Sequence, residues 1–289
     1  MFIKSKKLNA YIAFKPIKMI TLTSKEKLRL RSRYGDWALV TGATSGIGYE
    51  IACLLAEAGF NLVICSRQSN RLQSAANKFT DTFHIEVKVV AADLSRHEDV
   101  SILLNDIRDV KIGLIVLSAG YGTSGLFTNS SIHEELNMLH LNCNAVLQIT
   151  HHFANQFAHD KRGGIILLSS MVAFQGVPYS ANYSASKAYV QSLAEAIHVE
   201  LKPLGVDVLA AAPGPVRSGF GHRANMQMNM YLLPAQVGIP ILKALGRKST
   251  VLPGLLTKIL VYSLMTVPRW AKIRIMKLVM GGMTKHQRS

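Results

Sequence analysis

Long apolar runs and cysteines are scarce in this chain of 289 residues, and each shortage excludes a class of protein. No apolar stretch reaches the roughly 20 residues that span a bilayer, because the longest candidate, residues 251–267, is broken by Pro253, Gly254 and Lys258. Lysines interrupt the apolar residues of the segment 1–20, so no secretory signal is expected and the protein is predicted to be cytoplasmic. The three cysteines lie far apart in apolar runs, which predicts reduced, buried thiols and neither a disulfide framework nor a metal site.

Acidic residues are also few, and they are unevenly distributed. Lys and Arg total 33 against 17 Asp and Glu, which gives a formal net charge of +16. Residues 1–37 carry +8 and residues 38–207 carry −4, whereas residues 208–289 hold twelve basic residues and no acidic one. A mildly acidic body without a base-stacking or helix-turn-helix signature argues against a nucleic-acid-binding protein. The two basic flanks instead indicate an anionic surface, such as the inner face of a membrane.

Between these flanks, apolar runs alternate with segments whose apolar residues recur at helical spacing. The runs are continuously apolar, which is typical of strands in a parallel sheet covered by helices on both sides. Right-handed crossovers make such a sheet doubly wound, so the predicted fold class is α/β with a Rossmann-like parallel sheet. The predicted strands lie within residues 37–40, 61–66, 85–94, 112–120, 163–170 and 206–216.

A glycine-rich turn, TGATSGIG at 41–48, joins the first strand to the first helix. Glycine permits a positive φ and lets the backbone approach a pyrophosphate, while the helix N-terminus offers free N–H groups to the anion. The spacing is G-x3-G-x-G rather than the standard G-x-G-x-x-G, but its strand–turn–helix setting favours dinucleotide binding over a plain loop. The predicted contacts in this turn are Gly42, Thr44, Ser45, Gly46, Ile47 and Gly48.

The end of the second strand bears on the choice of cofactor. NAD enzymes usually carry an acidic residue there, whereas this chain has Ser66 followed by Arg67. A guanidinium attracts a 2′-phosphate that a carboxylate would repel. The sequence therefore favours NADP(H) and leaves NAD(H) open. The alternative for Arg67 is that it only begins a solvated helix.

Tyr183 and Lys187 are four residues apart and would share one face of a helix. Free tyrosine titrates near pH 10, and a neighbouring ammonium is expected to lower that pKa, which would suit the phenol to proton transfer. A plain surface pair on a helix is the alternative.

Ser170 ends the strand at 163–170, where its hydroxyl could bond a substrate oxygen. Ser169 is the competing hydroxyl, although alternation along a strand should turn the two apart.

Together these motifs resemble the short-chain dehydrogenase/reductase family over residues 37–220. The resemblance rests on TGATSGIG (41–48), Asp93-Leu94, SAG (118–120), Asn142, Ser170, YSASK (183–187) and PGPVRS (213–218), in that family's order and spacing. It implies that Tyr183 is the acid/base, that Lys187 lowers its pKa and holds the nicotinamide ribose, and that Ser170 positions the substrate oxygen. It also implies that Asn142 supports a water and proton relay, with Asn144 as the nearby rival.

The resemblance also implies further cofactor contacts and an assembly. Asp93, with Leu94 beside it, would contact the adenine, and Ala119 and Gly120 would allow close approach to the cofactor. Pro213, Gly214, Val216 and Ser218 would line the nicotinamide side. A homodimer or homotetramer is expected on the same ground.

Three positions depart from the family pattern. Ser218 stands where the family usually has threonine, and it keeps the hydroxyl. Ser118 stands where the family usually has asparagine, which predicts a weaker hydrogen bond between strands and intact catalysis. Ser45 stands where NADP enzymes often carry a basic residue, so Arg67 is left as the main argument for a 2′-phosphate.

The segment after the last motif is rich in methionine, at positions 226, 228 and 230. Because methionine adapts its shape, this segment predicts either a flexible apolar lid for a hydrophobic substrate or simple filling of the core. Residues 255–280 predict two helices flanking Pro268, with basic and apolar side chains interleaved. Such helices suit a membrane interface, a subunit contact or a plain surface.

The sequence therefore predicts three parts: a basic N-terminal extension (1–36), a catalytic domain (37–250, with a lid at about 218–235) and a basic amphipathic helical extension (251–289). The predicted activity is that of an NADP(H)-dependent oxidoreductase that interconverts a carbonyl and a secondary alcohol on a small hydrophobic molecule. The alternative is a catalytically silent dinucleotide sensor or scaffold on the same fold.

Overall fold

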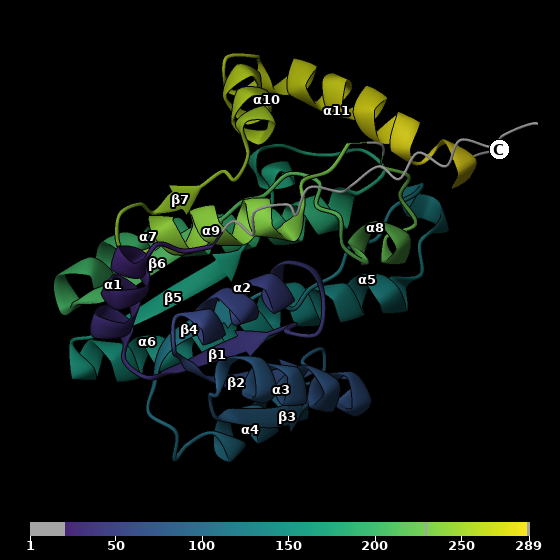
Figure 1. Ribbon diagram of the computed structural model, residues 1–289. Coiled ribbons are helices and arrows are strands. Elements are labelled where there is room, and N and C mark those ends of the chain that lie inside the picture. Colours follow the sequence, from purple (N-terminus) through teal and green to yellow (C-terminus); the bar gives the residue numbers. More distant parts are fainter. Residues whose placement is uncertain (1–20, 229, 288–289) are drawn as a thin grey trace, which may run out of the picture.

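The computed structural model describes residues 21–228 and 230–287. Seven strands form one parallel sheet in the order β3-β2-β1-β4-β5-β6-β7 (Figure 1). The strand order reverses between β1 and β4, the switch point at which ligands bind in open α/β sheets. The predicted doubly wound sheet is thus confirmed. The strands are β1 (Trp37–Thr41), β2 (Asn61–Ser66), β3 (Val87–Ala91), β4 (Ile112–Leu117), β5 (Gly163–Leu168), β6 (Val206–Ala211) and β7 (Thr250–Val251).

Helices cover both faces of the sheet. Successive residues of the central strands point to opposite faces and are buried in two separate cores. Val40 and Ile64 belong to a core shared with α2, α3 and α9, whereas Leu39 and Val63 belong to a core shared with α4, α6 and α7. The helices of the first face are α2 (Gly46–Glu57), α3 (Ser69–Phe83) and α9 (Pro234–Ala244), and those of the second are α4 (His97–Asp106), α5 (Ile132–Leu139), α6 (Val146–Asp160) and α7 (Ala181–Leu201).

Shorter elements complete the chain. A π-helical turn at His140–Ala145 joins α5 to α6, and α8 (Phe220–Arg223) follows the last family motif. Single 3₁₀ turns lie at Phe127–Asn129, Met171–Phe174, Lys202–Leu204 and Lys285–Gln287. The three cysteines are free, with Cys65 buried in the sheet and Cys53 and Cys143 half-buried, in keeping with the predicted reduced thiols.

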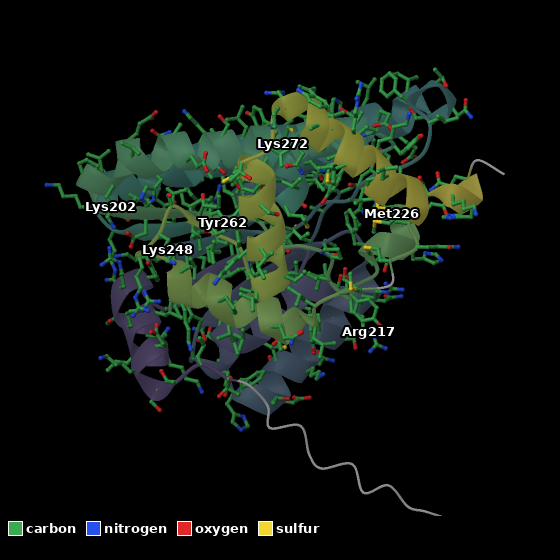
Figure 2. The ribbon with its side chains drawn as sticks, turned by 90° about the horizontal axis from the view of Figure 1, so that it is seen from above. Lys202, Arg217, Met226, Lys248, Tyr262 and Lys272 are labelled. Carbon is green, nitrogen blue, oxygen red and sulfur yellow. The ribbon has the colours of Figure 1, made fainter. Side chains whose placement is uncertain are left out.

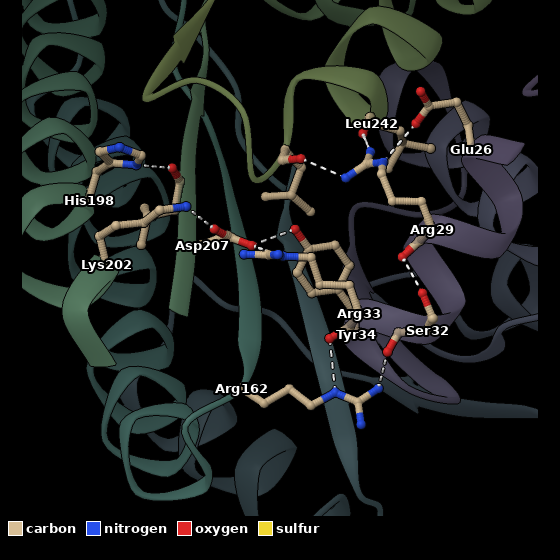
Figure 3. A network of polar contacts seen from close by, with 12 residues as sticks. Glu26, Arg29, Ser32, Arg33, Tyr34, Arg162, His198, Lys202, Asp207 and Leu242 are labelled. Carbon is tan, nitrogen blue, oxygen red and sulfur yellow. Dashed lines mark hydrogen bonds and ion pairs between the residues drawn. The ribbon is translucent and has the colours of Figure 1, made fainter. Parts of the chain in front are cut away.

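An ion cluster closes the amino end of the sheet (Figure 3). Asp207, in β6, is 1% exposed and accepts hydrogen bonds from three side chains of other elements. The Tyr34 hydroxyl donates at 2.8 Å and Lys202 Nζ at 2.7 Å, and Arg33 Nε is the third donor. Arg33 and Tyr34 come from α1 (Ser24–Tyr34), so the cluster fastens that helix to the body. The sequence analysis did not anticipate this cluster.

At the opposite end, α10 (Leu255–Met265) and α11 (Arg269–Met283) form a hairpin above the carboxyl ends of the strands (Figure 1). These are the two helices predicted around Pro268. Seen from above, the hairpin lies across the molecule, and Met226 lies near the end of α11 (Figure 2). The backbone N–H of Gln227 donates to the Met283 carbonyl at 2.9 Å, which ties the two segments together. Within the described ranges, no helix has both the length and the apolar character needed to cross a membrane.

Candidate active site

A cavity of about 1240 Å³ opens at the carboxyl ends of the strands. Its volume exceeds the roughly 300–1,000 Å³ of common ligand sites, so a dinucleotide and a second molecule fit together. The predicted site residues line this cavity, except that Gly48 and Asn142 lie behind its wall. The lining residues predicted from the sequence are Gly42, Thr44, Ser45, Gly46, Ile47, Arg67, Asp93, Leu94, Ala119, Gly120, Ser170, Tyr183, Lys187, Pro213, Gly214, Val216 and Ser218.

The glycine turn between β1 and α2 has no room for side chains at two positions. Gly42 has φ +70°, and a Cβ there would lie 2.9 Å from the backbone nitrogen of Ala119. A Cβ on Gly48 would lie 2.5 Å from the Gly42 carbonyl oxygen. Glycine therefore permits the close turn that leaves the N-terminus of α2, at Gly46, facing the cavity.

The link between β1 and β4 at this turn comes from a threonine. Thr41 Oγ1 accepts hydrogen bonds from the backbone nitrogens of Ser118 and Ala119, both at 3.1 Å. These bonds hold the SAG segment (118–120) against the glycine turn. Ser118 is the position at which the family usually has an asparagine. Whether Ser118 weakens the strand contact, as predicted, stays a prediction.

The edge of the cavity beyond β2 combines neutral and charged groups. Ser66 Oγ lies 3.3 Å from Thr44 Oγ1, and Arg67 Nη1 lies 3.7 Å from Asp93 Oδ2. The other carboxylate oxygen of Asp93 accepts from the Ser95 hydroxyl at 2.8 Å, which fixes the carboxylate at the cavity wall. The Arg67 side chain is 44% exposed, so its guanidinium is free to contact a ligand as well as Asp93.

Tyr183 and Ser170 meet inside the cavity. Tyr183 lies in the first turns of α7 and is 8% exposed, and the hydroxyl of Ser170, which follows β5, lies close enough to its phenol to favour the phenolate. Ser169 is turned to the helix, because its hydroxyl donates to the Lys187 carbonyl at 3.0 Å. Ser170 is therefore the hydroxyl at the phenol, as strand alternation predicted.

The expected lowering of the Tyr183 pKa by Lys187 is wrong for this arrangement. Burial raises the pKa of Tyr183 to about 12, and the hydrogen bond with Ser170 offsets only part of that rise. Burial likewise lowers the pKa of Lys187 to about 8. Lys187 Nζ lies 5.9 Å from the centroid of the Tyr183 ring and donates to the Leu168 carbonyl at 2.8 Å. The phenol thus stays protonated at neutral pH and can donate a proton.

Asn142 is fully buried in the π-helical turn, a feature that is frequent at functional sites. Its Nδ2 donates to the Tyr121 carbonyl at 2.9 Å and to Ser186 Oγ at 3.1 Å, and its Oδ1 accepts from the Tyr121 nitrogen at 3.2 Å. The side chain thereby joins the segment that follows β4 to α7, whereas its rival Asn144 is exposed. A Cβ on Gly120 would lie 2.9 Å from Asn142 Oδ1, so glycine is needed at that position.

The cavity has an apolar wall that the sequence indicated only in part. Met226, Met228 and Met230 line it, as the lid interpretation predicted. The helical hairpin also lines it, although the sequence pattern had been attributed to a membrane, a partner or a plain surface. The hairpin contributes Leu256, Leu260, Leu264, Val267, Ile275, Met276, Val279, Met280 and Met283.

Sequence reasoning missed several polar or aromatic members of the site, among them Arg71, Tyr121 and Arg223. Arg71 lies in the first turn of α3, whereas Arg67 precedes that helix, so no helical spacing linked the two. Tyr121 directly follows the SAG motif. Arg223 carried no motif, because its position depends on how the lid folds back over the strands.

A family model described as short chain dehydrogenase matches residues 36–229. The chain is therefore an oxidoreductase that belongs to the short chain dehydrogenase family.

Two relatives and three solved structures show the range of similarity. A very-long-chain 3-oxoacyl-CoA reductase-like protein of Arabidopsis thaliana is 34% identical, over 63% of this chain and 60% of its own length. A 7beta-hydroxysteroid dehydrogenase of Collinsella aerofaciens is 27% identical, over 78% of this chain and 89% of its own. A structure described for 7beta-hydroxysteroid dehydrogenase stereoselectivity has a TM-score of 0.80, with 26% identity, and covers 86% of this chain and 98% of its own.

The two other structures are also similar over most of their length. A short-chain dehydrogenase from Sphingobium yanoikuyae in complex with NADPH has a TM-score of 0.73 and 26% identity, and covers 81% of this chain and 96% of its own. A bulky-bulky ketone specific alcohol dehydrogenase from Comamonas testosteroni has a TM-score of 0.70 and 28% identity, and covers 82% and 96%.

Proposed function

We propose that this protein is an NADP(H)-dependent oxidoreductase that interconverts a carbonyl and a secondary alcohol on a large hydrophobic molecule. The observation that carries the proposal is the buried phenol of Tyr183, with the Ser170 hydroxyl beside it, in a cavity lined by a glycine turn and by an apolar wall. A phenol that is protonated at neutral pH suits proton donation to a carbonyl oxygen.

The residues of the chain divide the work of the reaction. When bound, the nicotinamide cofactor supplies or accepts the hydride. In reduction, Ser170 holds the carbonyl oxygen by a hydrogen bond, and Tyr183 donates its proton to that oxygen as negative charge develops there. Oxidation is the reverse and needs Tyr183 as the phenolate: the phenol first loses its proton to solvent and then takes the proton of the alcohol. Lys187 holds the ribose with its ammonium, and Asn142 supports the helix from which both side chains project.

The residues that line the cavity are chemically suited to the groups of a dinucleotide cofactor. The turn with Gly42 and Gly48 and the N-terminus of α2 suit a pyrophosphate, and the Asp93 carboxylate suits the adenine amino group. Arg67 suits a 2′-phosphate, which favours NADP(H) over NAD(H). The NADPH complex of the similar Sphingobium yanoikuyae enzyme supports this choice.

The apolar wall indicates the substrate class. Methionines of the lid and apolar side chains of the hairpin enclose the part of the cavity that lies beyond Tyr183. Such a wall is suited to a steroid-like or long-chain carbonyl compound. The names of the similar proteins, which include hydroxysteroid, very-long-chain 3-oxoacyl-CoA and bulky ketone enzymes, agree with that inference.

We expect purified protein to oxidise NADPH when a bulky ketone is added. The panel would contain a ketosteroid, a long-chain 3-oxoacyl thioester and, as the matched control, a four-carbon ketone. Burial of additional apolar surface predicts a kcat/KM for the bulky compounds about 100-fold above that for the small ketone, and a preference for NADPH over NADH. Preference for the small ketone would contradict the substrate class. Tight dinucleotide binding without turnover of any compound would favour the silent sensor.

We further propose that the outer face of the α10–α11 hairpin lies on an anionic membrane surface. Large apolar side chains point away from the cavity there, with Leu255 74%, Trp270 63% and Leu278 79% exposed. Basic residues accompany them, and the chain has no acidic residue from 208 onward. Tyr262 and Lys272 lie on the surface seen in Figure 2. Apolar bulk combined with one sign of charge suits an interfacial helix.

The basic segment 1–20, also predicted to contact a membrane, lies outside the described residues. The predicted homodimer or homotetramer stays a prediction.

A double substitution of Trp270 and Leu278 by serine should reduce co-sedimentation with liposomes that contain phosphatidylserine. Each lost side chain removes apolar burial of about 1.5–3 kcal/mol, so the pair should weaken binding at least 100-fold. Val199→Ser, on α7, is the matched control because Val199 is 70% exposed on another surface. Equal sedimentation of wild type and double variant would contradict the proposal. A change in oligomeric state alone would assign the face to a second copy of the chain.

A further inference from the structure

Arg223 occupies an unusual position in the lid. It is the last residue of α8, and it lines the same cavity as the glycine turn. Its guanidinium carbon lies 4.0 Å from the centroid of the Tyr121 ring, which is the closest cation–π contact among the described residues. A guanidinium in such a contact keeps N–H donors that can bind a ligand.

The Tyr121 platform is rigid. Its hydroxyl donates to the Glu134 carbonyl at 3.0 Å, and both its backbone polar groups are bonded to Asn142. The ring is 3% exposed, so it has no freedom to move away from Arg223. A guanidinium held on such a platform loses little entropy when it binds an anion.

Arg223 forms no salt bridge within the described part of the chain, whereas Arg67 has Asp93 at 3.7 Å. Burial, and then the positive charge of Arg67, lower the pKa of Arg223, while Tyr121, Glu134 and Asp93 oppose that lowering. Arg67 and Arg71 line the same cavity, so three guanidinium groups face it. Arginine stays charged in proteins, and three such cations suit an anionic ligand.

We propose that Arg223 binds one of the phosphates of the bound dinucleotide. The inference rests on the proposed function, because it takes the dinucleotide as the ligand. Two phosphate groups could supply this chemistry, namely the 2′-phosphate and the pyrophosphate. The electrostatic influence of Arg67, at the end of β2, on Arg223 favours the 2′-phosphate. Arg223 is then a cofactor-binding residue carried by α8.

Calorimetric titration of the full chain with NADPH and with NADH tests this inference. Arg223→Ala should weaken NADPH binding about 10- to 100-fold, the usual effect of losing a charged hydrogen bond. Arg223→Lys should recover part of the loss, because the charge remains. Arg217→Ala is the matched control: Arg217 directly precedes the lid and contacts a tyrosine, at 5.8 Å from the Tyr231 centroid, but it does not line the cavity.

The pattern of affinities identifies the phosphate. Loss confined to NADPH assigns Arg223 to the 2′-phosphate, and equal loss for both nucleotides assigns it to the pyrophosphate. Unchanged affinity of Arg223→Ala for both, with wild-type protein binding NADPH, would overturn this inference and leave the proposed function intact. Failure of the wild-type protein to bind either nucleotide would overturn both.

Discussion

A Tyr183→Phe variant is expected to lose about 10²- to 10⁴-fold in kcat, the range that general acid–base catalysis contributes. Phenylalanine retains the ring, which packs against Phe220 with 5.2 Å between centroids, so the cavity keeps its shape. Only the proton donor is removed. The measurement is turnover of the best ketone with NADPH, together with the NADPH dissociation constant, which should stay unchanged.

Tyr189→Phe provides the matched control for this substitution. Tyr189 lies on the same helix and is 39% exposed, and it does not line the cavity. Its loss of a hydroxyl should leave kcat within about 2-fold of wild type. Turnover of Tyr183→Phe at a similar level would refute the acid/base role, whereas joint loss of turnover and NADPH binding would indicate a collapsed site.

An Asp207→Asn variant is expected to lose about 3 kcal/mol of unfolding free energy, because it removes the one carboxylate of a buried cluster. Three donors would then face a neutral amide at a position that is 1% exposed. Arg33 and Lys202 are each 47% exposed, so water can solvate them in part and the cost lies at the low end for a broken buried pair. Urea unfolding followed by circular dichroism gives the value.

The pH dependence of this loss has a definite sign. Burial by itself would raise the pKa of Asp207, but the hydrogen bonds from Arg33, Lys202 and Tyr34 outweigh it and hold the pKa below its usual value. The stabilisation is therefore complete above the unfolded-state pKa of about 3.9, and it disappears as the pH falls through the lower folded-state pKa. The difference between wild type and variant should shrink accordingly in acid.

Asp109→Asn controls for the loss of a carboxylate at the surface. Asp109 is 85% exposed and pairs with Arg108 at 3.6 Å, so its loss should cost under about 0.5 kcal/mol. Equal effects of the two substitutions would contradict the role given to the cluster. NADPH turnover by Asp207→Asn should remain near wild type at low urea, since the cluster lies at the opposite end of the sheet from the cavity.

The sequence was sufficient for the fold and for the motif residues that line the cavity, for a physical reason. Continuous apolar runs are needed in a buried parallel sheet, and close backbone approach demands glycine at Gly42, so both constraints are visible locally. β7 has only two residues, too few to show a period. The direction of the Tyr183 pKa shift depends on burial, and no spacing of residues reveals how much of a helix will be covered.

Other features depend on contacts between distant segments. The side chains of α11 that line the cavity alternate with exposed ones, and the pattern alone fits a membrane, a partner or a cavity equally well. The contact of Arg223 with Tyr121 requires the lid to fold back over β4. The sequence could have indicated a buried ion pair at Asp207, because a lone acidic residue in an apolar strand needs a buried partner. The identity of its partners in α1 could not be predicted.

The ion cluster around Asp207 has a practical consequence for making the protein. The region shared with the family begins at residue 36, after Arg33 and Tyr34. A recombinant chain trimmed to that boundary would keep the buried carboxylate and Lys202 but discard the two donors of α1. Its expression and solubility would suffer although every residue of the cavity were present. The segment that must be cloned is therefore longer than the segment that the family model matches.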